Sequence, residues 1–192
     1  EGTHWHLHAH VAIDALAAEF GTTPDAVQAT IEAALATLHA ARATRERPAF
    51  DDKALTAWNG LAIRALAIAS RALDRPDLAD AATRAVDFLR AHAWRDGRLT
   101  ATWRDGRAQI PGFLDDYAFL ADALLELAQT RWRAADLEWA RELADAMLAH
   151  FEDPAGGFWF TANDAEAPLH RSKSYADDAL PAGNGVAARV LG

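Results

Sequence analysis

The chain has 192 residues, of which 51% are hydrophobic and 24% are charged, as is typical of an ordinary soluble helical protein and not of a disordered one. Its net charge of -9 argues against nucleic acid or an anionic membrane as the main partner, because both require a basic surface. Cysteine is absent, which excludes disulfides and thiol chemistry within these residues. No apolar run approaches the roughly 20 residues of a membrane span, a signal-like start is lacking, and we expect a cytoplasmic location.

The first segment carries histidines at four alternate positions, His4, His6, His8 and His10. On a strand they would share one face and could bind a metal, since imidazole is a common metal ligand. No cysteine and no helical His-x-x-x-His pattern accompanies them. We therefore predict neither a metal site nor another cofactor.

Three helices are predicted in the first half of the chain. Thr23 is the expected cap of the first, Pro24 fits its first position, and Pro48 ends it. Its apolar residues share one helical face: Val27, Ile31, Leu35 and Leu38. A second helix follows Asp51-Asp52 and is apolar on more than one side, as expected of a helix buried within a layer. A third runs from about residue 76 to 93.

The stretch 94–112 breaks the helical pattern. Asp96-Gly97 and Asp105-Gly106 are turn signals, and the strand-like residues 99–103 between them predict a small β-excursion on a loop. A fourth helix follows Asp115-Asp116, and a fifth spans about 134–151. Residues 156–160 predict a second turn with a short strand, and a sixth helix follows Pro181.

Pairs of aspartates recur at almost equal intervals, at 51–52, 115–116 and 177–178, so that the gaps are 64 and 62 residues. Such a period indicates stacked helical hairpins, in which equivalent positions lie at the same end of equivalent helices. The helices behind the aspartate pairs are the more apolar ones. An all-α architecture with inner and outer helices satisfies both facts, either an (α/α) toroid or an open solenoid of the same hairpins. Three hairpins make half of a six-hairpin ring, so we expect residues 1–192 to be a single fragment of one toroid domain.

The run from Arg47 to Leu61, RPAFDDKALTAWNGL, resembles the hallmark RPxxDDKxLTAWNGL of the YyaL and spermatogenesis-associated protein 20 family. Asp116-Tyr117-Ala118-Phe119-Leu120 and the run GGFWFTA at 156–162 are similar to further family motifs, DYAFLIDGLLELYEAT and GGFFFTA. The stretch 177–184 is similar to DGATPSGN, although Asp178, Leu180 and Ala182 depart from it. The resemblance covers nearly the whole chain. It implies a six-hairpin, glycosidase-like toroid that follows a thioredoxin-like domain in bacterial and eukaryotic proteins. That thioredoxin-like domain is absent from these residues, so its redox chemistry is not carried over.

The aspartate pairs are the candidate site. A carboxylate at a helix N-terminus tends to stay ionised and can act as base, nucleophile or cation ligand, unless burial or a second carboxylate raises its pKa. We predict catalytic roles for Asp115, Asp116 and Asp52. Predicted ligand-binding residues are Trp58, Asn59, Tyr117, Asp177 and Asn184. The simpler alternatives are helix capping for the aspartates, a place in the core for Trp58, and close packing or hydrogen bonds to the loops for the two asparagines.

Two classes of function stay open. The first is a carbohydrate-active domain, a hydrolase or an epimerase-like isomerase, that binds a sugar-like small molecule with its rim carboxylates. The second is a non-catalytic toroid that binds a ligand or partner on behalf of a thioredoxin-like domain. A cleft with aromatic rings facing a close carboxylate pair would favour the first, and aspartates bonded fully to backbone N–H groups would favour the second.

Overall fold

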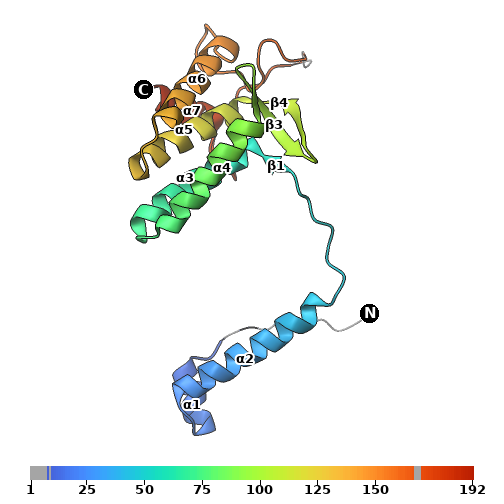
Figure 1. Cartoon of the computed structure of the whole chain (residues 1–192), viewed down its shortest axis with the longest axis vertical. Coiled ribbons are helices and arrows are strands. Elements are labelled where there is room, and N and C mark those ends of the chain that lie inside the picture. The colour runs from blue at the N-terminus through green and yellow to red at the C-terminus, as the bar shows by residue number, and fades with distance from the viewer. Residues whose placement is uncertain (1–7, 9, 167–169) are drawn as a thin grey trace. The chain divides into compact units, whose positions relative to one another are not determined.

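The computed structural model describes residue 8, residues 10–166 and residues 170–192 (Figure 1). The contacts within the chain divide it into two compact units, residues 1–50 and residues 51–192. Each unit is described by itself. No helix in the described ranges is both long and apolar enough to cross a bilayer.

In its described residues the first unit contains two helices, α1 (Ile13–Phe20) and α2 (Pro24–Ala43). The predicted start of α2 is confirmed, because Thr23 Oγ1 accepts a hydrogen bond of 3.3 Å from the N–H of Ala26 and Pro24 occupies the first turn. The helix buries none of its residues, however. Its apolar face is exposed, with Ile31 at 36%, Leu35 at 53% and Leu38 at 50%.

The histidine segment is described only in part, since His4 and His6 lie outside the described residues. His8 and His10 are exposed and belong to no strand, and His10 Nδ1 lies 3.3 Å from the carbonyl oxygen of His8. Across the ranges that the structure describes, no group of three or more His, Cys, Asp or Glu side chains could hold a metal ion.

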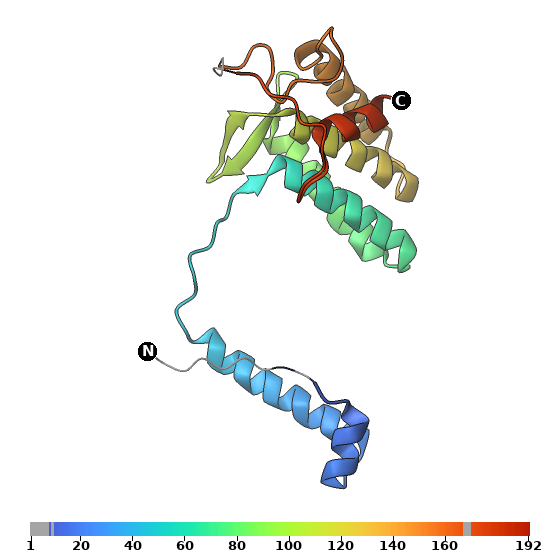
Figure 2. The same ribbon diagram turned by 180° about the vertical axis from the view of Figure 1, so that it is seen from behind.

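The second unit is built from helical hairpins. α3 (Thr56–Ala72) pairs with α4 (Pro76–His92), α5 (Leu114–Thr130) pairs with α6 (Ala134–His150), and α7 (Gly183–Leu191) follows. These bounds agree with the predicted helices. The three helices α3, α5 and α7 pack side by side, with α5 in the middle (Figures 1 and 2). Ten of the 17 residues of α5 are buried, as predicted for an inner helix.

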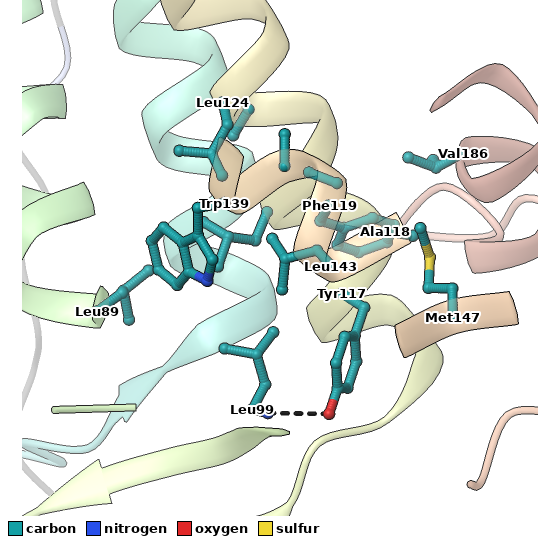
Figure 3. Close-up of a cluster of buried hydrophobic side chains, with 14 of the residues drawn as sticks. Leu89, Leu99, Tyr117, Ala118, Phe119, Leu124, Trp139, Leu143, Met147 and Val186 are labelled. Atoms are coloured by element: carbon teal, nitrogen blue, oxygen red, sulfur yellow. Dashed lines mark hydrogen bonds between the residues drawn. The ribbon is translucent and has the colours of Figure 1, made fainter. Parts of the chain in front are cut away.

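The core lies around the first half of α5. Tyr117, Phe119, Leu120 and Leu124 of this helix are at most 1% exposed. They belong to one buried cluster with Leu89 of α4, Leu143 and Met147 of α6, and Val186 of α7 (Figure 3). Burying aromatic and aliphatic side chains from five helices together, α3 included, accounts for the main stabilisation of this unit.

The predicted β-excursion is confirmed. Strands β2 (Trp94–Arg95), β3 (Arg98–Arg104) and β4 (Arg107–Pro111) form antiparallel hairpins, and β1 (Ala54–Leu55) pairs with the other side of β3. The two turns are Asp96-Gly97 and Asp105-Gly106, and all four residues have positive φ, as the tightest hairpin turns require. The second predicted strand, near residue 158, is reduced to a single bridge between Glu152 and Phe158.

Helices α3 and α5 approach each other at Gly60. A Cβ atom built on this glycine would lie 2.8 Å from the carbonyl carbon of Phe119 and 2.9 Å from the amide nitrogen of Leu120. Gly185 occupies the corresponding place in the second Asn-Gly sequence, on α7, and a Cβ atom there would meet nothing within 4 Å. The same dipeptide therefore serves a close helix contact in α3 and faces open space in α7.

This contrast predicts opposite effects of one substitution. Gly60→Ala should destabilise the protein by about 1–3 kcal/mol, because the added methyl group forces two backbones apart. Gly185→Ala should leave the stability unchanged or raise it by up to about 1 kcal/mol, because alanine favours a helix more than glycine does. Urea unfolding followed by circular dichroism measures both. Equal effects of the two substitutions would contradict the close contact.

Candidate functional site

The N-termini of α3, α5 and α7 meet at one end of the second unit. Asp116 in the first turn of α5 accepts a 2.8 Å hydrogen bond from the N–H of Ala57 in the first turn of α3. On the other side, the carboxylate of Asp115 touches the start of α7, where a Cβ on Gly183 would lie 2.0 Å from its Oδ1. The two adjacent aspartates thus contact one neighbouring helix each.

Both carboxylate oxygens of Asp116 are used by backbone N–H groups. Oδ1 accepts from Ala57, and Oδ2 accepts from Phe113 at 2.8 Å, which caps α5 itself. The side chain is 3% exposed. Burial, together with the charge of Asp115, raises the pKa of Asp116 to about 6, although the two backbone hydrogen bonds act to lower it. This residue is the cap that the sequence suggested, but it caps two helices at once.

Asp115 is in a different environment. It is half-buried, and burial raises the pKa of its carboxyl group above the ordinary value. In the part of the chain that the structure describes, no hydrogen-bond donor is paired with its oxygens. Its carboxylate lies beside the first residue of α7, at the positive end of that helix. Asp115 is consequently the member of this pair that has acceptor atoms available to a ligand.

Tyr117 is fully buried and does not line the surface. Its hydroxyl oxygen accepts hydrogen bonds from the N–H of Leu99 at 2.9 Å and from Arg98 Nε at 3.3 Å, so it attaches β3 to α5 (Figure 3). We expected this ring among the ligand-binding residues, but the structure gives it a place in the core. The aromatic residue behind the acidic pair is there to anchor the loop.

The two asparagines that precede glycine also hold backbone. Asn184 Oδ1 accepts from the N–H of Phe158 at 2.7 Å, and its Nδ2 donates to the carbonyl oxygens of Phe158 and Ser174 at 2.9 and 3.0 Å. Asn59 Nδ2 donates to the carbonyl oxygen of Leu55 at 2.8 Å. Asn184 therefore bonds to the preceding loop, as one of our alternatives had it.

The remaining predicted residues lie on more exposed backbone. Trp58 is 60% exposed, so the alternative prediction, that this side chain belongs to the core, was wrong. Asp52 forms an ion pair with Arg104, at 2.7 Å from Oδ1 to Nε, and both side chains are about half exposed. Asp177 Oδ1 accepts a hydrogen bond of 2.8 Å from the N–H of Ala182, directly before α7.

The three aspartate pairs are not equivalent in space, although their spacing suggested so. Asp115 and Asp116 lie inside the first turn of α5, whereas α3 begins only at Thr56 and α7 only at Gly183. The carboxylate of Asp51 bonds to the backbone N–H and the ammonium group of Lys53 and does not cap α3, the helix that follows it. The acidic pairs therefore share one end of the unit without sharing one structural role.

Sequence reasoning missed the arginines near this end. Arg98 forms an ion pair with Asp164 and a hydrogen bond with Tyr117, and Arg104 pairs with Asp52. Both residues lie on β3, at its two ends. The β-hairpin pattern predicted the strand but contained no signal for the residues that the two arginines bind. Asp52 is 52 residues from Arg104, and Asp164 is 66 residues from Arg98.

Four cavities occur elsewhere in the described structure, with volumes between about 280 and 530 Å³. None of these four is lined by Asp115, Asp116 or Trp58. The candidate site is therefore described by its three helix N-termini, and none of these four cavities belongs to it.

The environment of Asp116 predicts a pH-dependent stability. The folded state keeps its proton up to about pH 6, whereas the unfolded chain releases it near 3.8, so the folded state binds more protons between these values. The free energy of unfolding should therefore fall as the pH rises through this window, by on the order of 3 kcal/mol from this group. Urea titrations at pH 4, 5, 6 and 7 measure the fall.

The variant Asp116→Asn tests the assignment. It removes the titration, so its stability should change less with pH than that of the wild type. It should also be less stable at pH 4, because an amide has one acceptor oxygen for two N–H donors. A pH profile parallel to that of the wild type would assign the dependence to other groups.

The role of Tyr117 predicts a second effect on stability. Tyr117→Phe leaves the N–H of Leu99 buried without its acceptor, which should cost about 1–3 kcal/mol. The matched control is Tyr175→Phe, since Tyr175 is 65% exposed and its loss of a hydroxyl should cost less than about 0.5 kcal/mol. Thermal unfolding of both variants makes the comparison, and equal losses would remove the anchor role of Tyr117.

The chain was compared with known protein sequences and structures. No family model matches the chain. It is 35% identical over 193 residues to spermatogenesis-associated protein 20 of Mus musculus, a match that covers 94% of this chain and 24% of the mouse protein. The chain thus spans about a quarter of the length of this curated relative.

Two solved structures resemble this chain in fold. A cellobiose 2-epimerase from Bacillus thermoamylovorans matches with a TM-score of 0.53 and 11% identity, over 58% of this chain and 33% of the epimerase. An unsaturated glucuronyl hydrolase variant described with the saccharide dGlcA-Glc-Rha-Glc matches with a TM-score of 0.51 and 21% identity, over 61% of this chain and 34% of the hydrolase. Both neighbours are α/α toroid enzymes, which confirms the predicted fold class. Over the quarter of the mouse relative's length that it spans, the chain belongs to the spermatogenesis-associated protein 20 family.

Proposed function

We propose that this chain provides part of a carbohydrate-recognising toroid, in which a sugar-like small molecule binds at the rim formed by the N-termini of α3, α5 and α7. The observation that carries the proposal is the half-buried carboxylate of Asp115, which has a raised pKa and no donor from the protein among the described residues. Sugar hydroxyl groups are donors that such a carboxylate can accept from. The fold likeness to an epimerase and a hydrolase that act on saccharides supports the ligand class.

Trp58 supplies the apolar part of the proposed site. It is 60% exposed on the first turn of α3, one residue after the N–H group that Asp116 binds. An exposed indole beside carboxylates is suited to stack on the C–H face of a sugar ring, because it offers a large flat apolar area with little loss of conformational entropy. Asp52 and Asp177 lie on the backbone segments that enter α3 and α7, where they are partly occupied by Arg104 and by the N–H of Ala182.

In the proposed chemistry Asp115 and Asp116 have separate roles. A carboxyl group with a raised pKa transfers protons closer to neutral pH, so Asp115 is the proposed proton donor or acceptor toward the ligand. Asp116 keeps the two helices in place, and the charge of Asp115 contributes to its raised pKa. Hydrolysis of a glycosidic bond requires two carboxyl groups that both reach the substrate, whereas an epimerase-like proton transfer can begin from one.

A specific observation favours binding without catalysis as the second candidate. Both oxygens of Asp116 are bonded to backbone N–H groups, and one oxygen of Asp177 is as well. A domain in which these carboxylates have structural roles can bind a ligand without converting it to a product. It can also bind a thioredoxin-like partner domain. The two candidates differ in whether Asp115 changes the ligand or only holds it.

We expect neutral disaccharides such as cellobiose to raise the melting temperature of the wild-type chain in a thermal-shift screen. Asp115→Asn should leave the melting temperature of the free protein within about 2 °C of the wild type and weaken ligand binding at least tenfold, about 1.4 kcal/mol, by calorimetry. Trp58→Ala should weaken binding by a similar factor because stacking is lost. Chromatography of the incubated sugar separates an enzyme from a binding domain.

The matched control is Asp52→Asn, which removes a rim carboxylate that is already paired with Arg104. It should change ligand binding less than threefold. If Asp115→Asn retained both the ligand binding and the turnover of the wild type, the carboxylate site would be abandoned. Loss of turnover with unchanged binding would support the catalytic role over the binding role.

A further inference from the structure

A row of charged side chains crosses the three inner helices below the rim. Asp122 of α5 binds Arg64 of α3, with 2.8 Å between Oδ2 and Nε, and also binds Arg189 of α7, with 2.6 Å between Oδ2 and Nη2. Glu126, one turn further along α5, binds Arg64 and Arg71. The row therefore alternates in sign from α3 to α5 to α7 and ends at a cation.

The row identifies which positions of the three helices are equivalent. When Asn59, Tyr117 and Asn184 are superposed in register, Arg64, Asp122 and Arg189 fall at the same position, five residues further on. The observed ion pairs join those same three residues, so residues that are aligned in this register also lie at the same level of the three helices. In this register Gly60 of α3 corresponds to Gly185 of α7.

The equivalent faces of α3 and α7 differ in what covers them. On α3 the positions are Gly60, Ile63 and Ala67, which are buried where α5 packs on this helix. On α7 the corresponding residues, Gly185, Ala188 and Gly192, are exposed. All three are small, as Gly60 and Ala67 are on α3, and they leave the backbone of α7 accessible to a second helix.

Arg189 adds a charge requirement to this face. Asp122 binds the guanidinium group through Nε and Nη2, and Arg189 is still 55% exposed. The row holds three arginines, Arg64, Arg71 and Arg189, but only two acids, Asp122 and Glu126. One further carboxylate beside Arg189 would balance the positive charges of the row and continue its alternation of positive and negative side chains.

Beside α7 lies an apolar groove of about 530 Å³ that extends the uncovered surface. Its walls come from α5, α6 and α7, and its apolar lining includes Leu125, Leu137, Ala140, Ala144 and Val190. Leu137 is 42% exposed. A helix lying on α7 would have this groove at its side to receive larger apolar side chains.

We propose that the face of α7 formed by Gly185, Ala188, Arg189 and Gly192 is a docking surface for an acidic α-helix. This helix crosses α7 at Gly185 as α5 crosses α3 at Gly60, and it places a carboxylate against Arg189. The inner helices of a second copy of this chain do not fit these requirements. Its α3 would bring Arg64 to Arg189, its α7 would bring a second Arg189, and its α5 is already covered within its own unit.

The test uses a probe of the required chemistry, a fluorescein-labelled synthetic peptide with the sequence of residues 112–131, which contains α5 with Asp122. Binding to the full 192-residue chain is measured by fluorescence anisotropy. We expect saturable binding by the wild type and at least a tenfold loss for Gly185→Leu, whose side chain blocks the crossing. Arg189→Glu should cause a similar loss, and a peptide with Asp122→Arg should bind that variant at least tenfold better than the original peptide does.

Two controls make the result specific. Gly185→Leu should fold normally, since a Cβ there meets nothing within 4 Å, and thermal unfolding verifies this. Arg107→Glu makes the same charge change on an exposed residue of β4 and should bind the original peptide as the wild type does. Three outcomes would overturn the proposal: no peptide binding by the wild type up to 1 mM, binding unaffected by Gly185→Leu and Arg189→Glu, or a dimer of the wild-type chain in sedimentation that Gly185→Leu abolishes.

Discussion

The buried carboxylate of Asp116 is the contact on which the arrangement of the two central helices depends. It provides acceptors for an N–H group of α3 and for one of α5, so the two helix N-termini are held at one level. With that level set, Gly60 allows the backbones to touch and Arg64 reaches Asp122 further down. An uncompensated backbone N–H in this position would be costly, which explains why a carboxylate is retained where it is 3% exposed and its pKa is raised.

Contacts of three kinds repeat along the inner helices. At the top, a polar side chain holds the preceding loop: Tyr117 binds β3, and Asn184 binds Phe158. In the middle, small residues let the helices approach, and below them charges alternate across the row of Arg64, Asp122 and Arg189. Each hairpin is therefore specified mainly by its neighbour, as in other repeat architectures. On α7 the equivalent positions, Gly185, Ala188 and Gly192, are exposed.

The two adjacent aspartates show how little a motif says about chemistry. Asp115 and Asp116 have neighbouring places in one helical turn, but successive residues of a helix point in different directions. One is directed between α3 and α5 and becomes a structural cap, and the other lies against α7 with oxygens that no protein donor among the described residues binds. The resemblance in fold to saccharide enzymes does not distinguish these roles, because function resides in the site and not in the fold. The proposed sugar site therefore rests on Asp115 and Trp58, and not on the acidic pair as a unit.

Periodicity, caps and turn signals in the sequence predicted the helices of the second unit, the start of α2 at Thr23 and both Asp-Gly hairpin turns, because these depend on interactions between residues close in the chain. The family motifs and the apolar inner helices also indicated the toroid class, which the fold comparisons confirm. Other features were decided by tertiary structure: the burial of Tyr117, the exposure of Trp58, the uncovered face of α2 and the unequal roles of the three aspartate pairs. Each of these depends on which distant segment packs on the residue. The carboxylate of Asp116 meets Ala57 across 59 residues of chain, and no local pattern encodes that meeting.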